Sequence, residues 1–178
     1  MAETTDTARL FFALWPDAGV QRALGALAQD LGRECRGRAL PSRNIHLTLV
    51  FLGNVGRERL PRLEEIAVAT SAPPFGLNVD RVEYWRHNRI VWAGVERCPE
   101  ALTTLVARFG QMLAPEGFHF DDRAYVPHIT LLRNARRAPS TAAVPAVAWP
   151  VSRYALVESV PRGQGRAYEV LREWPLTA

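Results

Sequence analysis

The sequence has 178 residues, of which 48% are hydrophobic and 22% charged, so it is typical of a globular protein that buries its own core. Its two cysteines, Cys35 and Cys98, form no CxxC pair, which argues against a disulfide framework or a zinc ribbon. The formal net charge of +4 would suit an anionic partner such as RNA, but all 22 basic residues are arginine. Coding bias in a GC-rich genome explains that composition better, so the charge permits RNA binding without indicating it.

The first residues, MAETTDTARLFFALWP, place acidic side chains before a short apolar run. A secretory signal would place positive charge there and continue with a longer apolar stretch. The sequence also has no apolar run as long as a membrane span. We therefore expect a cytoplasmic protein without a membrane segment.

Apolar runs bounded by turn residues predict the strands in chain order. The expected strands cover residues 9–14, 45–52, 75–85, 89–95, 127–133, 154–160 and 168–174. His87 and Asn88 separate the third strand from the fourth, which indicates a hairpin. Residues 134–150 are rich in alanine and proline and indicate a loop, and the turn PRGQGR joins the last two strands.

Apolar residues at helical spacing predict helices between these strands. The first helix follows Asp17, whose side chain is suited to cap its amino terminus. The other two are expected at residues 58–69 and 100–113.

Two of the expected strands carry the same polar insertion. Residues 44–53 read NIHLTLVFLG and residues 127–133 read PHITLLR, so His-x-Thr-Leu occurs twice, about half the chain apart. Alternate side chains of a strand point to the same face, so His46 shares a face with Thr48, and His128 shares one with Thr130. The neighbouring apolar side chains would point the other way, into a core: Ile45, Leu47, Leu49, Phe51, Ile129 and Leu131.

The order of the elements suggests a duplication. We therefore expect residues 1–178 to form one α+β domain with two pseudo-symmetric lobes. Each lobe would contain a mostly antiparallel sheet with helices on the outside, and an active-site cleft would lie between the lobes. The two His-Thr faces would then line that cleft from opposite walls.

This set of side chains suits the opening of a cyclic phosphate. Water must attack phosphorus in line with the departing oxygen, so a base is needed on one side and an acid on the other. Imidazole titrates near pH 6.5, so one ring can be neutral while the other is charged. Threonine hydroxyls can donate to the oxygens where charge develops, and the scheme needs no metal.

NIHLTLVFLG and PHITLLR resemble the paired HxTx signatures of the two-histidine phosphoesterase superfamily. The opening RLFFALWPD resembles the start of its bacterial and archaeal branch, the RNA 2′,3′-cyclic phosphodiesterases, also called 2′-5′ RNA ligases. The resemblance extends from Arg9 to Trp174. It implies hydrolysis of an RNA-terminal 2′,3′-cyclic phosphate to a 2′-phosphomonoester, with weak 2′-5′ RNA ligase activity. It also implies no cofactor, RNA ends or cyclic nucleotides as partners, and no obligate protein partner.

The resemblance also implies roles for individual residues. His46 matches the proton donor to the leaving 3′ oxygen, and His128 matches the proton acceptor from water. Thr48 and Thr130 match the phosphate-binding hydroxyls. Arg133 matches a substrate-contacting arginine after the second motif.

The position of Arg133 conflicts with a regular strand. It lies five residues past His128, and a regular strand would turn its side chain away from the cleft. Arg133 can contact the substrate only if the strand bulges or ends near Leu132. A solvated arginine at a strand end explains the residue equally well.

Other candidate residues have ordinary explanations. His119, Asp121 and Asp122 could hold a metal ion, but an exposed acidic loop accounts for them better. The basic run RNARR at residues 133–137 could steer an RNA backbone or form a solvated turn.

Aromatic residues could stack on a nucleobase. The candidates are Phe12, Trp85 and Tyr125, although core packing is the more common role for any one of them.

Two alternative functions stay open at the level of sequence. The first is the same chemistry on a different small cyclic nucleotide or another phosphoester, because loops outside the motifs determine the substrate. The second is an RNA-binding or 2′-5′ RNA-joining protein in which hydrolysis is incidental.

Overall fold

The computed structural model describes residues 6–121, 123–163 and 165–178. Within these ranges the α-helices are α1 (Ala18–Cys35), α2 (Leu60–Ala69) and α3 (Glu100–Leu113). The strands are β1 (Thr7–Leu14), β2 (Arg38–Ala39), β3 (Leu47–Gly56), β4 (Phe75–Trp85), β5 (Ile90–Gly94), β6 (Ile129–Arg133), β7 (Ala143–Val151), β8 (Arg153–Arg162) and β9 (Gly165–Pro175). Short 3₁₀ turns at Ser42–Asn44 and Arg57–Arg59 precede β3 and α2.

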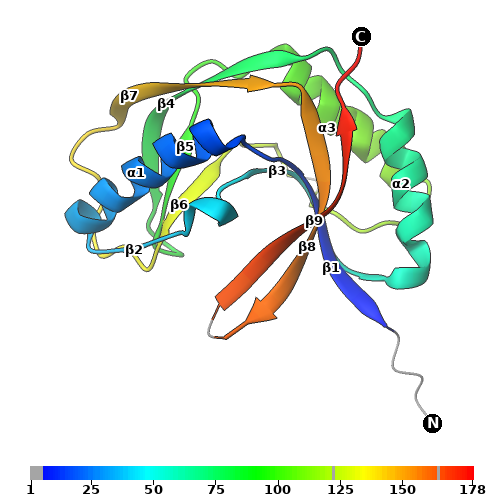
Figure 1. Ribbon diagram of the computed structural model, residues 1–178, viewed down its shortest axis with the longest axis horizontal. Helices are drawn as coiled ribbons and strands as arrows, with labels where there is room; N and C mark the ends of the chain where they lie inside the picture. The colour runs from blue at the N-terminus through cyan, green and yellow to red at the C-terminus, as the bar shows by residue number, and fades with distance from the viewer. Residues whose placement is uncertain (1–5, 122, 164) are drawn as a thin grey trace.

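The strands of the described chain form two antiparallel sheets, which confirms the predicted fold class (Figure 1). The first sheet has the order β3-β1-β8-β9, and the second has the order β2-β6-β5-β4-β7. Helices α2 and α3 lie together beside the first sheet, whereas α1 lies against the second sheet on the other side of the molecule (Figure 1).

The helices cross from one sheet to the other. α1 follows β1 of the first sheet and leads to β2, and it packs against β6 and β2 of the second sheet. α3 connects β5 to β6 in the second sheet, yet it packs against β3 of the first. α1 and α3 therefore each contact a motif strand, β6 and β3 respectively, in the sheet opposite to the strand that precedes the helix.

The lobes do not correspond to the two halves of the chain. β1 and β3 come from the first half, but the carboxy-terminal hairpin of β8 and β9 completes their sheet, with β8 paired to β1. A two-stranded ribbon is at best marginally stable by itself, so the hairpin gives the first sheet the width it needs to support a core.

Local sequence signals predict the place of most elements, and for some of them the bounds as well. Asp17 caps α1 by accepting a hydrogen bond from the Val20 N–H at 2.9 Å. β4 and α3 have the predicted bounds. α2 begins at Leu60 instead of residue 58, because the chain first makes a 3₁₀ turn.

The predicted loop at residues 134–150 is wrong in its second part, where the chain forms β7. β7 pairs with β4 at the edge of the second sheet. Pro145 and Pro150 made the sequence resemble a loop, because proline has no N–H to donate and is therefore rare within strands. An edge strand tolerates proline, since one side of it needs no ladder hydrogen bonds.

A core of buried apolar side chains extends across both sheets, and it includes Leu10 of β1, Val79 of β4 and Leu131 of β6. Phe12 is fully buried and stacks on Phe109 of α3 with 4.4 Å between ring centroids. Phe12 therefore belongs to this core and presents no face to a nucleobase. The assignment of residues 1–178 to one domain stays a prediction. No helix of the described chain is long and apolar enough to cross a membrane.

Candidate active site

His46 and His128 each lie one residue before a strand, at the starts of β3 and β6, and not within the strands as predicted. In each ring, Nδ1 lies close to the carbonyl oxygen two residues earlier, 2.8 Å from that of Asn44 and 2.9 Å from that of Val126. A carbonyl oxygen only accepts, so Nδ1 carries the hydrogen, and Nε2 is the nitrogen that exchanges a proton. Both motifs thus select the same tautomer.

Aromatic side chains fix the plane of the His46 ring. Trp15 stacks on the imidazole with 5.3 Å between centroids and 7° between planes, and Phe11 and Tyr168 each lie at 4.9 Å. None of these residues was singled out from the sequence. Trp15 and Phe11 belong to the segment RLFFALWPD, whereas Tyr168 reaches the site only because β9 joins the first sheet through β8.

Two tryptophans hold His128 on the opposite lobe. Trp85 of β4 lies at 4.7 Å and Trp92 of β5 at 6.2 Å between centroids, and both meet the imidazole edge to face. The indole surfaces restrict water around the ring, as the aromatic side chains do around His46.

This packing lowers the proton affinity of both imidazoles. Burial lowers the pKa of His46 from 6.5 to about 4, and burial also lowers the pKa of His128. The hydrogen bond to Asn44 opposes the effect at His46, while positive charge on His128 and Arg133 adds to it. Both rings are therefore neutral near pH 7 in the protein without a bound anion, and the effect of charge on His128 and Arg133 on the pKa of His46 agrees with their place in one cleft.

The lowered pKa predicts a loss of stability in acid. As the pH falls below 6.5, an unfolded chain protonates His46 while the folded protein does not until about pH 4. Between pH 7 and pH 4.5, the free energy of unfolding should therefore fall by about 2 to 3 kcal/mol more in the wild type than in His46→Gln. Urea denaturation at both pH values measures this difference, with the exposed His119→Gln as the matched control. Identical pH dependence in wild type and His46→Gln would show that the folded protein protonates His46 as readily as the unfolded chain.

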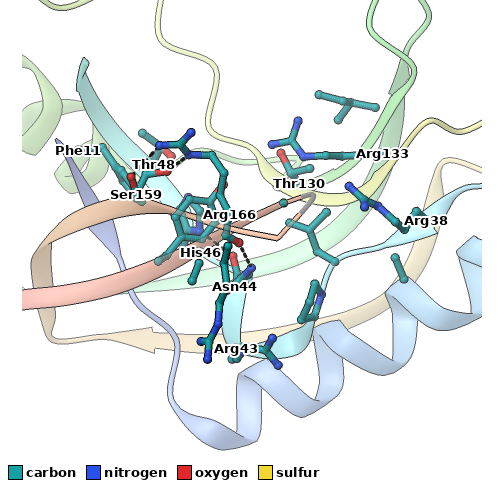
Figure 2. Close-up of a pocket in the computed structure, with 18 of the residues that line it drawn as sticks. Phe11, Arg38, Arg43, Asn44, His46, Thr48, Thr130, Arg133, Ser159 and Arg166 are labelled. Carbon is teal, nitrogen blue, oxygen red and sulfur yellow. Dashed lines mark hydrogen bonds between the residues drawn. The ribbon is translucent and has the colours of Figure 1, made fainter. Parts of the chain in front are cut away.

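Thr48 and Thr130 face each other from the two lobes. Both side chains are half-buried and line the cleft that contains the histidines, as the strand alternation predicted. Within the described part of the chain, neither hydroxyl has a hydrogen-bond partner, so both can donate to a ligand. Figure 2 shows Thr48 beside His46 and Thr130 on the opposite side.

A β-bulge in β6 returns Arg133 to the cleft. The pairing with β5 passes from Thr130 to Leu132 and skips Leu131. Leu131 and Leu132 are both fully buried, and the next side chain, Arg133, lines the cleft. The structure thus contains the bulge that the sequence required of Arg133, and a contact with the substrate stays a proposal.

Phe51 is the equivalent residue of the first motif, five positions after His46. The prediction that it points into the core is wrong. The pairing of β3 with β1 is also irregular, so Leu49 and Val50 are both buried while Phe51 is 39% exposed and lines the cleft. The bulge reverses the alternation of buried and exposed side chains along β3. A prediction that assumes a regular strand therefore places Phe51 on the wrong face.

The cleft between the lobes has a volume of about 890 Å³ and a positive lining. Of its described lining residues, none is acidic and six are arginines: Arg9, Arg38, Arg43, Arg133, Arg162 and Arg166. Only Arg133 was singled out from the sequence, because the others lie on elements that the tertiary fold brings together. Such a concentration of charge favours a polyanionic ligand.

Arg166 and Asn44 connect the β8–β9 hairpin to the first motif (Figure 2). Arg166 donates from Nη2 to the carbonyl of Ser159 at 2.8 Å, and Asn44 donates from Nδ2 to the carbonyl of Arg166 at 3.1 Å. The carbonyl of Asn44 accepts the hydrogen bond from His46. The hairpin therefore helps to position the turn that orients His46.

The remaining sequence candidates lie outside this cleft. Asp121 pairs with Arg123, His119 is exposed, and Asp122 lies outside the described residues. The residues that the structure describes contain no cluster of three His, Cys, Asp or Glu side chains that could hold a metal ion. Arg137 donates to the carbonyl of Glu34 at 2.6 Å, so this arginine of the RNARR run stabilises the end of α1.

Comparisons with known proteins agree with this fold. A family model described as LigT like Phosphoesterase matches residues 14–92. The RNA 2′,3′-cyclic phosphodiesterase of Escherichia coli is 34% identical over 95% of this chain and 97% of its own. That of Thermus thermophilus is 32% identical over 94% of this chain and 90% of its own. A crystal structure of E. coli LigT complexed with 3′-AMP is similar, with a TM-score of 0.87 and 30% identity, and it covers 97% of this chain and 100% of that chain.

The shared fold and the paired motifs define a phosphoesterase of the two-histidine class. The chain belongs to the LigT-like phosphoesterase family.

Proposed function

We propose that the protein hydrolyses an RNA-terminal 2′,3′-cyclic phosphate to a 2′-phosphomonoester without a metal ion. The observation that carries this proposal is the pair of imidazoles, held in the same tautomer on opposite lobes of one arginine-lined cleft. The names of the relatives from E. coli and T. thermophilus support the same reaction and RNA as the substrate class.

In this mechanism the cyclic phosphate lies between His46 and His128. Neutral His128 takes a proton at Nε2 from the water that attacks phosphorus. The P–O3′ bond breaks on the opposite side, and protonated His46 gives its proton to the departing 3′ oxygen. The phosphate then remains on the 2′ oxygen. A 5′-hydroxyl of RNA in place of water would give a 2′-5′ linkage by the same proton transfers.

His46 must gain a proton before it can act as the acid. Its pKa of about 4 keeps it neutral in the free protein at pH 7. An anionic phosphate beside the ring stabilises the imidazolium and raises this pKa. Substrate binding and protonation of His46 are therefore linked, and the neutral free ring avoids adding a seventh positive charge to the six arginines of the cleft.

The threonines and Arg133 complete the phosphate site. The hydroxyls of Thr48 and Thr130 donate to the non-bridging oxygens, where negative charge increases in the transition state. Arg133 adds a fixed positive charge from the side of the second motif, and its planar guanidinium can donate two hydrogen bonds to one phosphate.

The first test is hydrolysis in the presence of EDTA. Purified protein is incubated with adenosine 2′,3′-cyclic phosphate or with an oligoribonucleotide that ends in the cyclic phosphate. We expect turnover that EDTA does not reduce, with the 2′-phosphate as the product in chromatography against 2′- and 3′-phosphate standards. Loss of activity in EDTA with recovery on adding a divalent cation would contradict the metal-free mechanism.

The same experiment separates the alternative functions. Tight binding of the RNA without turnover would favour an RNA-binding protein. Turnover confined to the mononucleotide would favour a small cyclic nucleotide as substrate. The cytoplasmic location and the absence of an obligate protein partner stay predictions.

A further inference from the structure

Two arginines of the cleft lie opposite each other on paired strands. β2 consists of only two residues, and its Arg38 pairs directly with Arg133 of β6. Directly opposite residues project to the same face of a sheet, and both of these side chains line the cleft. They lie on the same side of it as Thr130 (Figure 2). Two like charges in this arrangement repel each other and destabilise the strand pair.

Backbone contacts hold β2 in this place. Just after the strand, the N–H of Leu40 donates to the carbonyl of Leu131 at 2.8 Å. Just before it, Gly37 packs so closely on the chain that a Cβ added to it would lie 3.1 Å from the Cα of Ala135. Glycine permits this approach because it has no side chain. The position of Arg38 at the cleft is therefore fixed by the backbone.

No acidic group balances this arginine pair. The described lining of the cleft contains no acidic residue, and neither guanidinium of the pair has a hydrogen bond or an ion pair within the described chain. Two other arginines of the cleft are engaged: Arg9 covers the ring of Phe51, and Arg166 donates to Ser159. The charge of the arginine pair is thus available to a ligand.

The cyclic phosphate by itself does not account for both charges. It carries a single negative charge, and in the proposed mechanism it contacts both histidines, both threonines and Arg133. Arg38 lies one strand farther from His128, at the edge of the second sheet, because the strand order there is β2-β6-β5. An RNA end supplies a second negative charge next to the first, on the phosphodiester attached to O5′ of the terminal nucleotide.

We propose that Arg38 binds this phosphodiester, which joins the terminal nucleotide to the rest of the RNA, while Arg133 faces the cyclic phosphate. The proposal rests on the proposed function and deepens it, because such a site selects the ends of RNA chains over free cyclic nucleotides. Paired strands lie about 5 Å apart, so two long arginine side chains can spread from them to two consecutive phosphates. The bound RNA then neutralises the repulsion within the arginine pair, and each planar guanidinium can donate two hydrogen bonds to its phosphate.

Two further arginines allow an internal comparison. Arg43 and Arg162 also line the cleft without a partner in the described chain. They lie in the turn before β3 and at the end of β8, so they belong to the side of the first sheet. Removing either one takes the same charge from the cleft but leaves the arginine pair intact.

The experiment removes one charge from the substrate at the linkage in question. Both probes are dinucleotides in which 2′-deoxyadenosine is joined 3′ to 5′ to adenosine 2′,3′-cyclic phosphate. One has a phosphodiester linkage and the other an uncharged methylphosphonate, whose diastereomers are assayed separately. The deoxyribose has no hydroxyl beside the linkage and therefore keeps it stable. We expect kcat/KM of the wild type at low salt to be about 10-fold higher on the phosphodiester, the effect of one hydrogen bond to a charged group.

Variants at Arg38 locate the effect. Arg38→Gln should reduce the ratio of the two kcat/KM values most of the way to one, whereas Arg38→Lys keeps the positive charge and should retain most of the ratio. Arg43→Gln and Arg162→Gln should lower the ratio by less than about twofold, because salt screens charges that do not contact the linkage. The matched control is Arg22→Gln, which removes an exposed arginine of α1 outside the cleft and should retain the ratio.

The salt dependence gives a second readout that a merely structural role of Arg38 would not change. On the phosphodiester, the plot of log kcat/KM against log salt concentration should be less steep in Arg38→Gln than in the wild type by about 0.7, the slope for one phosphate contact of a single strand. On the methylphosphonate, the slopes of the two proteins should agree. Equal slopes on the phosphodiester would contradict a direct contact between Arg38 and the linkage.

The outcomes distinguish this phosphodiester site from the proposed function. Equal kcat/KM of the wild type on the two probes would overturn the site and leave the hydrolytic function intact. An equal loss on both probes in Arg38→Gln would also overturn it, because Arg38 would then act on the cyclic phosphate. The same holds if Arg43→Gln or Arg162→Gln abolished the ratio and Arg38→Gln did not. Failure of the wild type to hydrolyse either probe or a cyclic-phosphate oligoribonucleotide would overturn the proposed function, and the phosphodiester site with it.

Discussion

Replacing either His46 or His128 with alanine should lower kcat by about 10²- to 10⁴-fold, the usual contribution of a positioned acid or base. Each ring is half-buried and lines the cleft with Nε2 as its proton-exchanging nitrogen. Single-turnover rates on a cyclic-phosphate oligoribonucleotide measure the chemical step. His119→Ala, which removes an exposed histidine outside the cleft, is the control and should retain the wild-type rate.

The double variant tests whether the two rings act as one unit. If the proton taken by His128 and the proton given by His46 move in a single displacement, removing the second ring should cost much less than removing the first. The rate of the double variant should then be close to that of the slower single variant. Each variant needs a cooperative unfolding transition to show that it is folded. A folded His46→Ala or His128→Ala with near-normal kcat would refute the assignment.

Replacing Thr48 or Thr130 with valine should lower kcat/KM on the order of 10²-fold for each lost donor. Valine keeps the branched shape and removes only the hydroxyl, so the packing beside each histidine is retained. Neither hydroxyl donates to another described residue, and therefore the substitution breaks no internal hydrogen bond.

Serine variants at the same positions keep a hydroxyl and should recover most of the activity. Thr103→Val on the exposed surface of α3 serves as the control for a threonine outside the site. The result that speaks against phosphate binding is a Thr→Val variant with unchanged kcat/KM on the cyclic-phosphate oligoribonucleotide. Similar losses at Thr48 and Thr130 would show that the two lobes contribute equally to the transition state.

The two His-Thr motifs could be predicted to line one surface because a strand imposes its period on the sequence. His46 with Thr48, and His128 with Thr130, are two residues apart in apolar surroundings, so each pair must share a face. The helix cap at Asp17 and the bounds of α3 followed from similarly local rules. The edge strand β7 was not predicted, because Pro145 and Pro150 interrupt the strand pattern of the sequence. A strand can contain these prolines only because it lies at the edge of the sheet.

Other parts of the site depend on contacts between distant segments. Tyr168 reaches His46 because β9 pairs with β8, and Arg38 reaches Arg133 because β2 pairs with β6. The bulges that expose Phe51 and Arg133 arise from pairing with β1 and β5, and the sequence contains no local signal for them. The lowered pKa of His46 is likewise a consequence of burial by segments that fold around it.

By itself, the sequence determined the α+β class, most of the elements and the two repeated His-Thr pairs, because these depend on spacing along the chain. Only the tertiary structure decided that six arginines line one cleft and that Phe51 faces this cleft and not the core. The physical reason is that strand period and helix capping are local, whereas register shifts, burial and the summed charge of a cleft depend on which strands pair.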